Sequence, residues 1–295
     1  MKVTVKVPAT SANLGPGFDS FGLALTLYNT ITLEETESGL EFTGCPAEYA
    51  NEDNLIYVSY KAAMDYMGIP VKGLKVDISS EIPISRGLGS SAALLTAGAM
   101  GANALHGNPL SLQQILEVTN PIEGHPDNLA PAIFGGMTAS MMCGDRPITV
   151  PCPLHPDWKF LTLVPDFPLS TSAARGVLPA SYSRADAVYN VGRGALVVKA
   201  LELGDEALLA IAMDDKIHQP YRRSLIADYG IIEDMCRSQG AAFCLSGAGP
   251  TLLCITRNPG LEEKLAKKLD AITEANWQMI PLHIEFQGAH VIDGE

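Results

Sequence analysis

A strand, a glycine-rich turn and a long apolar helix follow one another between residues 73 and 107, and this run constrains the fold more than any other feature. In "GLKVDISSEIP", Leu74, Val76 and Ile78 alternate with polar residues, which predicts a strand with one solvent-facing side. The segment "SAALLTAGAMGANALHG" is apolar on nearly all sides, which predicts a buried helix. Between the two stands "ISRGLGSS", so bare backbone and hydroxyl groups lie at the mouth of a helix.

This turn has the chemistry of an anion site. The first turn of a helix leaves N–H groups without intrahelical partners, and the helix dipole adds partial positive charge there. Glycines let phosphate oxygens approach the backbone without meeting a Cβ atom. The hydroxyls of Ser90 and Ser91 can donate to phosphate or coordinate Mg²⁺. The turn is therefore a candidate phosphate-binding loop.

Other kinds of glycine-rich turn have different sequence requirements. A Walker A loop needs a lysine, which is absent here, and no G-x-S-x-G serine-hydrolase elbow is present. "GLGSSA" fits the degenerate dinucleotide fingerprint, but a turn and a capped helix follow the buried helix, where a Rossmann unit needs a second strand. A purely structural strand-to-helix turn stays open for this stretch taken alone.

Composition excludes some partners and predicts a compartment. The chain has 295 residues and a formal net charge of −13, so nucleic acid and anionic membrane surfaces are disfavoured as partners. No apolar run is long enough to span a membrane, and the N-terminus lacks the apolar region of a signal peptide. The six cysteines form no C-x-x-C pair, which indicates reduced thiols and a cytoplasmic protein.

Periodicity and turn residues predict the remaining elements. We expect a strand over 2–7 that ends at Pro8, a loop over 9–22, a strand over 24–35, a helix closed by Gly68, and a helix capped by Ser111 and Gln114. Residues 121–136 are predicted as a loop that runs into a short helix near Leu129.

The second half follows a composition shift. Four prolines in residues 143–158 predict a linker, so we divide the chain into domains 1–150 and 151–295. After it we expect a strand, helices that include one over 222–240, two strands, a helix and a last strand. That order predicts an antiparallel α+β layer of ferredoxin-like type.

Three glycine-rich stretches together resemble the GHMP kinase family, which is named for galactokinase, homoserine kinase, mevalonate kinase and phosphomevalonate kinase. They are "PATSANLGPGFDSFGLAL" at 8–25, P-x-x-x-G-L-G-S-S-A-A at 83–93 and "LSGAGPT" at 245–251. They occur in the family's order and cover nearly the whole chain. The details "TSANLGPGFDSFGLAL", "HPDNLAPAIFGG" and "STSAAR" are similar to the homoserine kinase branch of this family.

The resemblance implies a fold and a reaction. The fold would be an α+β two-domain GHMP kinase, with an N-terminal half like domain 2 of ribosomal protein S5 and a C-terminal ferredoxin-like sandwich. The reaction would use ATP and Mg²⁺ to convert L-homoserine into O-phospho-L-homoserine, a step towards threonine. The family also implies a homodimer.

The resemblance also assigns the nucleotide and metal ligands. Asn54 would contact adenine, although a helix N-cap is an equally simple role for it. Glu117 and one serine of the pair 90–91, with Ser91 preferred, would hold the metal; without the family, Glu117 would be read as a solvated helix residue. The cofactor-binding segment would be Pro83, Ile84, Ser85, Arg86, Gly87, Leu88, Gly89, Ser90, Ser91, Ala92 and Ala93.

Homoserine carries an ammonium, a carboxylate and a reacting hydroxyl, so its site needs three kinds of partner. By resemblance, Asp19 would bind the ammonium, and Arg175 and Arg222 the carboxylate, because an arginine fork can bond both oxygens. Spacing alone does not separate Arg222 from Arg223. The resemblance completes the site with Asn13, Thr171, His125 and Asn128.

The resemblance places the acceptor hydroxyl at Asn128, which cannot take a proton at neutral pH. We therefore expect transfer without a protein base, with Asn128, Glu117 and Arg175 as the catalytic set, unless the adjacent Asp127 faces the substrate. His125 has the alternative role of bonding a backbone carbonyl. Two other functions stay open: a kinase for another small alcohol, such as mevalonate, which would leave Asp19 without a partner, and a silent metabolite-binding homologue.

Overall fold

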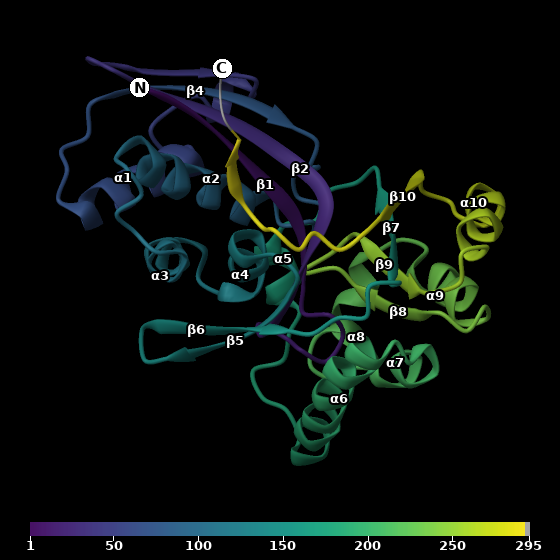
Figure 1. The fold of residues 1–295 in the computed structure, drawn as a ribbon. Coiled ribbons are helices and arrows are strands. Elements are labelled where there is room, and N and C mark those ends of the chain that lie inside the picture. The colour runs from purple at the N-terminus through teal and green to yellow at the C-terminus, as the bar shows by residue number, and fades with distance from the viewer. Residues whose placement is uncertain (293–295) are drawn as a thin grey trace.

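Two β-sheets with helices packed against them make up the molecule (Figure 1). The structure is a computed structural model that describes residues 1–292, apart from the side chains of residues 270 and 272. Among the described residues, no helix combines the length and the apolar character needed to cross a bilayer.

The first sheet has seven strands and forms most of the N-terminal half. Its main order is β11-β1-β2-β4-β3, and the remaining hairpin of β5 and β6 joins it through β2. The strands are β1 (Lys2–Ala12), β2 (Phe21–Thr36), β3 (Leu40–Thr43), β4 (Gly73–Ser80), β5 (Met137–Cys143), β6 (Arg146–Cys152) and β11 (His290–Ile292). Leu74, Val76 and Ile78 of β4 are buried while Lys75 and Asp77 are exposed, so the predicted one-sided strand is confirmed.

Helices α1 (Leu55–Met67), α2 (Ser90–Leu105), α3 (Leu112–Glu123) and α4 (Pro126–Phe134) accompany this sheet. Helix α2 lies between α1 and the sheet, which explains why it is apolar on nearly all sides. A Cβ atom at Gly98 would lie 2.1 Å from the carbonyl oxygen of Ile56, so α1 and α2 can pack this closely only with glycine there. The predicted caps of Gly68 on α1 and Ser111 with Gln114 on α3 are confirmed.

The second sheet has the predicted ferredoxin-like order. Its strands β7 (Lys159–Pro165), β8 (Ala242–Leu245), β9 (Leu252–Thr256) and β10 (Trp277–Leu282) are antiparallel and arranged β10-β7-β9-β8. The helices of this half are α5 (Thr171–Gly176), α6 (Arg184–Leu203), α7 (Glu206–Ala212), α8 (Gln219–Arg222), α9 (Tyr229–Arg237) and α10 (Leu261–Ile272). The two-domain α+β fold is thus the one predicted.

Several local predictions were wrong. Strand β1 does not stop at Pro8, because a register shift between Pro8 and Ala9 lets it continue to Ala12. The expected linker instead contains β6, which pairs with β5 alone among the described strands and therefore tolerates Pro147 and Pro151 on an edge. The single helix predicted over 222–240 is interrupted, since Asp228 has a φ of 60°.

The C-terminal segment of the chain returns from the second sheet to the first. Strand β11 pairs with β1, Ile284 forms a bridge with Leu25, and Tyr28 donates a hydrogen bond to Glu285. In Figure 1 the yellow C-terminal segment runs back beside the purple β1. The boundary near residue 150 stays a prediction, but residues 284–292 belong with the first sheet.

Candidate active site

The three glycine-rich stretches meet at one cleft of about 440 Å³. Backbone hydrogen bonds join them: the Gly247 N–H donates to the carbonyl of Ala12, and the Thr251 N–H donates to that of Arg86. The hydroxyl of Ser246 donates to the Gly87 carbonyl over 2.6 Å. Segments more than 150 residues apart in sequence thus build a single site.

The glycine turn lies at the start of α2, as predicted. Gly89 is the N-cap residue with a φ of 69°, and no side chain caps the helix. A Cβ atom at Gly87 would lie 2.5 Å from the Ser246 carbonyl oxygen, and one at Gly89 would lie 1.9 Å from Oγ1 of Thr10. Because its first N–H groups have no side-chain cap and border the cleft, the helix start can receive an anion.

Only part of the predicted phosphate segment reaches this cleft. Ile84, Ser85, Arg86, Gly87, Gly89, Ser90 and Ser91 line it. Leu88, Ala92 and Ala93 are instead packed in the core, and Pro83 is not among the lining residues. The guanidinium of Arg86 donates to the carbonyl oxygens of Ile84, Pro165 and Asp166, so it ties the turn to the end of β7.

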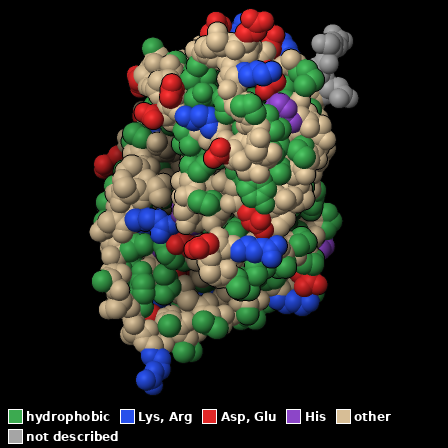
Figure 2. All heavy atoms as spheres, turned by 90° about the vertical axis from the view of Figure 1, so that its left-hand side faces the viewer, with side chains coloured by type: hydrophobic (Ala, Val, Ile, Leu, Met, Phe, Trp, Pro, Cys, Tyr) green, Lys and Arg blue, Asp and Glu red, His purple; other side chains and the backbone are tan. Residues whose placement is uncertain are grey.

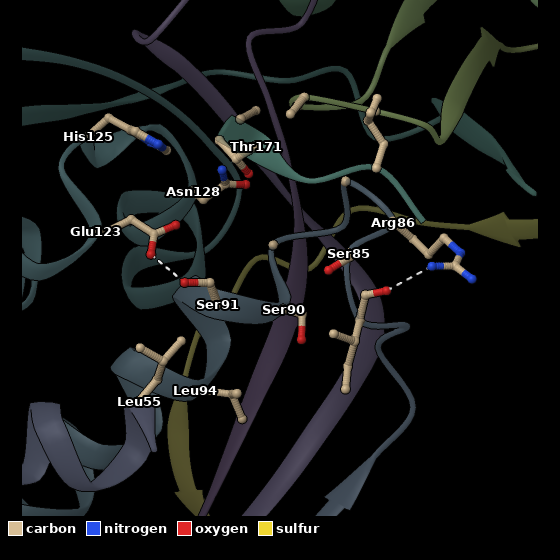
Figure 3. A pocket seen from close by; sticks show the side chains of 18 of the residues that line it. Leu55, Ser85, Arg86, Ser90, Ser91, Leu94, Glu123, His125, Asn128 and Thr171 are labelled. Carbon is tan, nitrogen blue, oxygen red and sulfur yellow. Dashed lines mark hydrogen bonds between the residues drawn. The ribbon is translucent and has the colours of Figure 1, made fainter. Parts of the chain in front are cut away.

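Ser91 contacts a carboxylate at the wall of the cleft. Its hydroxyl donates to Oε2 of Glu123 over 2.5 Å, and Figure 3 shows the two side chains pointing toward each other. Burial raises the pKa of Glu123, while the hydrogen bond from Ser91 and the charge of His125 oppose that rise. A hydroxyl and a carboxylate beside a helix start are the hard oxygen donors that Mg²⁺ prefers, so this pair fits a magnesium ion.

The assignment of Glu117 as a metal ligand does not fit the structure. Glu117 lies outside the lining residues and accepts hydrogen bonds from Arg146 over 2.8 Å and from Gln113 over 3.2 Å. The bond from Arg146 lowers the pKa of Glu117. Six residues of helix turn through about 600°, so Glu117 and Glu123 occupy different sides of α3.

An acid and two arginines occupy the other end of the cleft. Arg175 of α5 donates to both oxygens of Asp19, over 2.7 and 3.1 Å. Arg222 is only 1% exposed and donates to the carbonyl oxygens of Ala174 and Gly247. Burial, followed by the charge of Arg175, lowers the pKa of Arg222. Like charges so close together favour the entry of an anion.

His125 and Asp127 form a second close pair, with Nδ1 and Oδ1 2.6 Å apart. Burial alone would lower the pKa of His125, but the hydrogen bond and charge of Asp127, with the charges of Glu123 and Asp19, raise it overall. Asn128 accepts a 2.8 Å hydrogen bond from Thr10 at its Oδ1 atom. That bond fixes the amide of Asn128, which Figure 3 shows facing the same space as Thr171.

Comparison with known proteins agrees with this geometry. The models of the GHMP kinases N-terminal and C-terminal domains match residues 54–136 and 197–274. A homoserine kinase from Clostridium botulinum (strain Eklund 17B) is 42% identical over 297 residues and covers 99% of both chains. The chain belongs to the GHMP kinase family.

Other relatives extend the comparison. A homoserine kinase from Clostridium botulinum (strain ATCC 19397) is 43% identical over 293 residues, which is 98% of each chain. The crystal structure of homoserine kinase from Cytophaga hutchinsonii has a TM-score of 0.88 and 26% identity, with 99% of this chain and 97% of that chain covered. Mevalonate kinase from Methanococcus jannaschii, at 16% identity and a TM-score of 0.71, shares the fold.

Two further residues predicted for the site of this GHMP kinase, Asn13 and Asn54, make structural hydrogen bonds at the cleft. Asn13 donates to the Gly247 carbonyl and accepts from the Asp19 N–H, so it joins the first and third glycine stretches. Asn54 caps α1 through the Ile56 N–H and donates to the Tyr49 carbonyl, while also lining the cleft. The N-cap alternative for Asn54 is therefore realised, and a contact with adenine stays a prediction.

Two residues that line the cleft of this GHMP kinase, and one behind it, were not assigned from the sequence, where only Asp127 was named, as an alternative base. Glu123 and Asp127 line the cleft, and His218 lies fully buried behind Arg222. Glu123 and Asp127 stand in "PIEGHPDN", so that motif held the signal for both. His218 carries no such signal, because the carbonyl that its ring contacts, that of Gly15, is about 200 residues away in the sequence.

Proposed function

We propose that the chain transfers the terminal phosphate of ATP to the hydroxyl of L-homoserine and forms O-phospho-L-homoserine. One observation carries this proposal: a single cleft holds an uncapped helix start at one end, and an acid with two arginines at the other. The first suits a polyphosphate, and the second offers a partner to each charge of an amino acid. The full-length relatives named homoserine kinases support this choice of substrate.

The phosphates would lie on the amides of residues 87–91. Ser91 and Glu123 would hold a magnesium ion, which would neutralise charge on the phosphates. Gly87 and Gly89 let the turn pack against Ser246 and Thr10, because a Cβ atom at either position would overlap them. Asn54 and the lining residues Cys45 and Tyr49 would surround the base.

Asp19 would take the ammonium group of homoserine, and Arg175 with Arg222 the carboxylate. The Asp19–Arg175 pair must then open, because the substrate supplies opposite charges to both members. Asn128 has its Oδ1 atom bound to Thr10, so its Nδ2 atom would hold the acceptor hydroxyl. Asp127 is bound to His125, which supports transfer by positioning and charge stabilisation without a protein base.

We further propose that the active chain is a cytoplasmic homodimer. The six cysteines are free, which supports a reducing compartment. Helix α6 exposes Val188, Val191 and Leu196, and the β5–β6 hairpin exposes Met141 and Val150. Figure 2 faces the side from which this hairpin projects and shows hydrophobic side chains among the charged ones. Exposed apolar side chains offer a chain of net charge −13 contacts with its own copy that bring no like charges together.

A substrate panel tests the activity. ADP release is measured with ATP and each of L-homoserine, mevalonate, galactose and shikimate, and the phosphorylated product is identified by mass. We expect strong turnover with L-homoserine alone. Greater turnover of another alcohol would make that alcohol the substrate in place of L-homoserine, and binding without ADP release would show a silent homologue.

Light scattering at several protein concentrations tests the dimer, and a monomer at all of them would contradict it.

A further inference from the structure

A buried histidine holds the arginine at the charged end of the cleft. The Nε2 atom of His218 lies 2.8 Å from the carbonyl oxygen of Gly15, and its Nδ1 atom lies 3.2 Å from Nη1 of Arg222. A carbonyl can only accept, so Nε2 carries the proton. Arginine can only donate, so Nδ1 is the acceptor. Both contacts require His218 to be neutral, and burial lowers its pKa, with the charge of Asp215 opposing.

The position of His218 is fixed by its surroundings. The carboxylate of Asp215 accepts hydrogen bonds from the N–H groups of Ile217, His218 and Gln219, which anchors the start of α8. The ring of Phe18 stacks on His218, with centroids 5.3 Å apart and an angle of 26°. The histidine therefore presents Nδ1 in one direction, toward Arg222.

The partners of Arg222 hold it without neutralising it. Its Nε and Nη1 atoms donate to two carbonyl oxygens and to His218, and the Phe18 ring lies 5.2 Å from its Cζ atom. Within the described residues, Arg222 forms no ion pair and Nη2 makes no hydrogen bond. A carboxylate at this position would pair with the guanidinium and weaken its attraction for an anion. A neutral acceptor orients the arginine and leaves its charge available.

We propose that His218 is a positioning residue that aims Arg222 at the carboxylate of the amino-acid substrate and preserves the arginine's charge. This inference rests on the proposed function, since the anion is taken to be the carboxylate of homoserine. Arg175 differs in that Asp19 partly neutralises it before the substrate arrives. Arg222 is thus the stronger of the two attractors for the incoming carboxylate.

Two substitutions distinguish the roles of the two ring nitrogens of His218. In His218→Asn the amide oxygen can occupy the place of Nδ1 and still accept from Arg222. In His218→Gln the polar group reaches the place of Nε2, and the acceptor for Arg222 is lost. We expect KM for L-homoserine to rise on the order of 10–100-fold in His218→Gln and clearly less in His218→Asn, because a buried donor without a partner is costly. KM for ATP and the melting temperature serve as controls.

A substrate without the carboxylate completes the design. 3-Aminopropan-1-ol keeps the ammonium and hydroxyl of homoserine, so its kcat/KM should be the same in the native protein and both variants. Equal losses in the two variants, or equal losses with both substrates, would overturn the proposal and leave His218 a packing residue.

The substrate that the native protein phosphorylates distinguishes a failure of this inference from a failure of the proposed function. If another carboxylate-bearing alcohol of the panel is phosphorylated in place of homoserine, the proposed function fails, and the same comparison is made with that alcohol. If only alcohols without a carboxylate are phosphorylated, both proposals fall.

Discussion

The two ends of the cleft are built from different chemical groups. The end formed by residues 84–91, the amide end, consists of backbone groups, serine hydroxyls and two glycines whose Cβ positions are filled by other atoms. The charged end, formed by Asp19, His125, Asp127, Arg175 and Arg222, consists of side chains held by specific partners. The amide end is defined by shape, and the charged end by the pairing of its charges.

The two ends are expected to respond differently to substitution. The amide end has no side chain whose removal would abolish its N–H groups, so it is sensitive to added atoms. The charged end can lose or gain a charge without a change of backbone, so it should lose substrate affinity before it loses stability. The following variants test this contrast.

We expect the substitution Gly89→Ala to lower turnover on the order of 10²–10³-fold, the scale for loss of a preorganised donor. The added Cβ atom would overlap Oγ1 of Thr10 and displace the start of α2. Steady-state kinetics and thermal unfolding are measured together. Gly107→Ala is the matched control, because Gly107 also has a positive φ but no atom lies within 4 Å of its Cβ position. Equal losses in both variants would contradict the overlap argument.

We expect Glu123→Gln to lower turnover about 100-fold, because the metal site loses its charged ligand. Glu117→Gln should change turnover less than about twofold and cost at most about 1 kcal/mol of stability, since it breaks an ion pair with the exposed Arg146. Turnover is compared at several Mg²⁺ concentrations. If Glu117→Gln lowers turnover more than Glu123→Gln does, Glu117 is the metal ligand, as the family resemblance implies.

Asp127→Asn should lower turnover only about tenfold, because Asp127 orients His125 and is not a base in this proposal. If this variant is inactive while it still binds homoserine, and Asn128→Asp raises turnover, transfer does use a carboxylate base.

The same variant has a pH-dependent effect on stability. The pKa of His125 is raised in the folded protein, so its pairing stabilises the fold fully below the ordinary histidine value and loses strength as pH rises through the folded value. The deficit of Asp127→Asn in denaturant unfolding should therefore be largest near pH 5.5, at about 2 kcal/mol, and shrink by pH 9. A deficit that grows with pH would contradict the pairing.

Asn54→Ala should cost about 1 kcal/mol of stability through loss of the α1 cap. Asn54→Ser keeps a capping oxygen, so its stability should stay near that of the native chain. Denaturant unfolding and KM for ATP are measured for both. A tenfold higher KM for ATP in the stable serine variant would show that Asn54 contacts the nucleotide directly.

The sequence predicted those parts of the fold that depend on local chemistry. The glycine turn, the buried helix α2 and the capping box of α3 are set by residues within a few positions of one another, and all three were found where expected. The strand order of the second half was also predictable, because helical and strand periods alternate clearly there.

The parts that failed depend on distant partners. Pro147 and Pro151 indicated a linker, because nothing in the sequence shows that β6 has an edge position. Glu117 and Glu123 lie on one helix, and only the direction in which the helix packs decides which of them meets Ser91. The partners of His218 come from two segments, since Asp215 and Arg222 are its neighbours in the chain but Gly15 is about 200 residues away, so no spacing rule could join them all.

Strand β11 has a consequence for synthesis of the protein. It is the edge partner of β1, yet about 250 residues separate it from β2, the partner on the other side of β1. At a translation rate of roughly 5–20 residues per second, the last strand of the first sheet is synthesised on the order of ten seconds or more after β2. During that interval the backbone groups of Thr4, Val5 and Lys6 that face β11 have no strand to pair with, so this edge of the sheet stays open on the nascent chain.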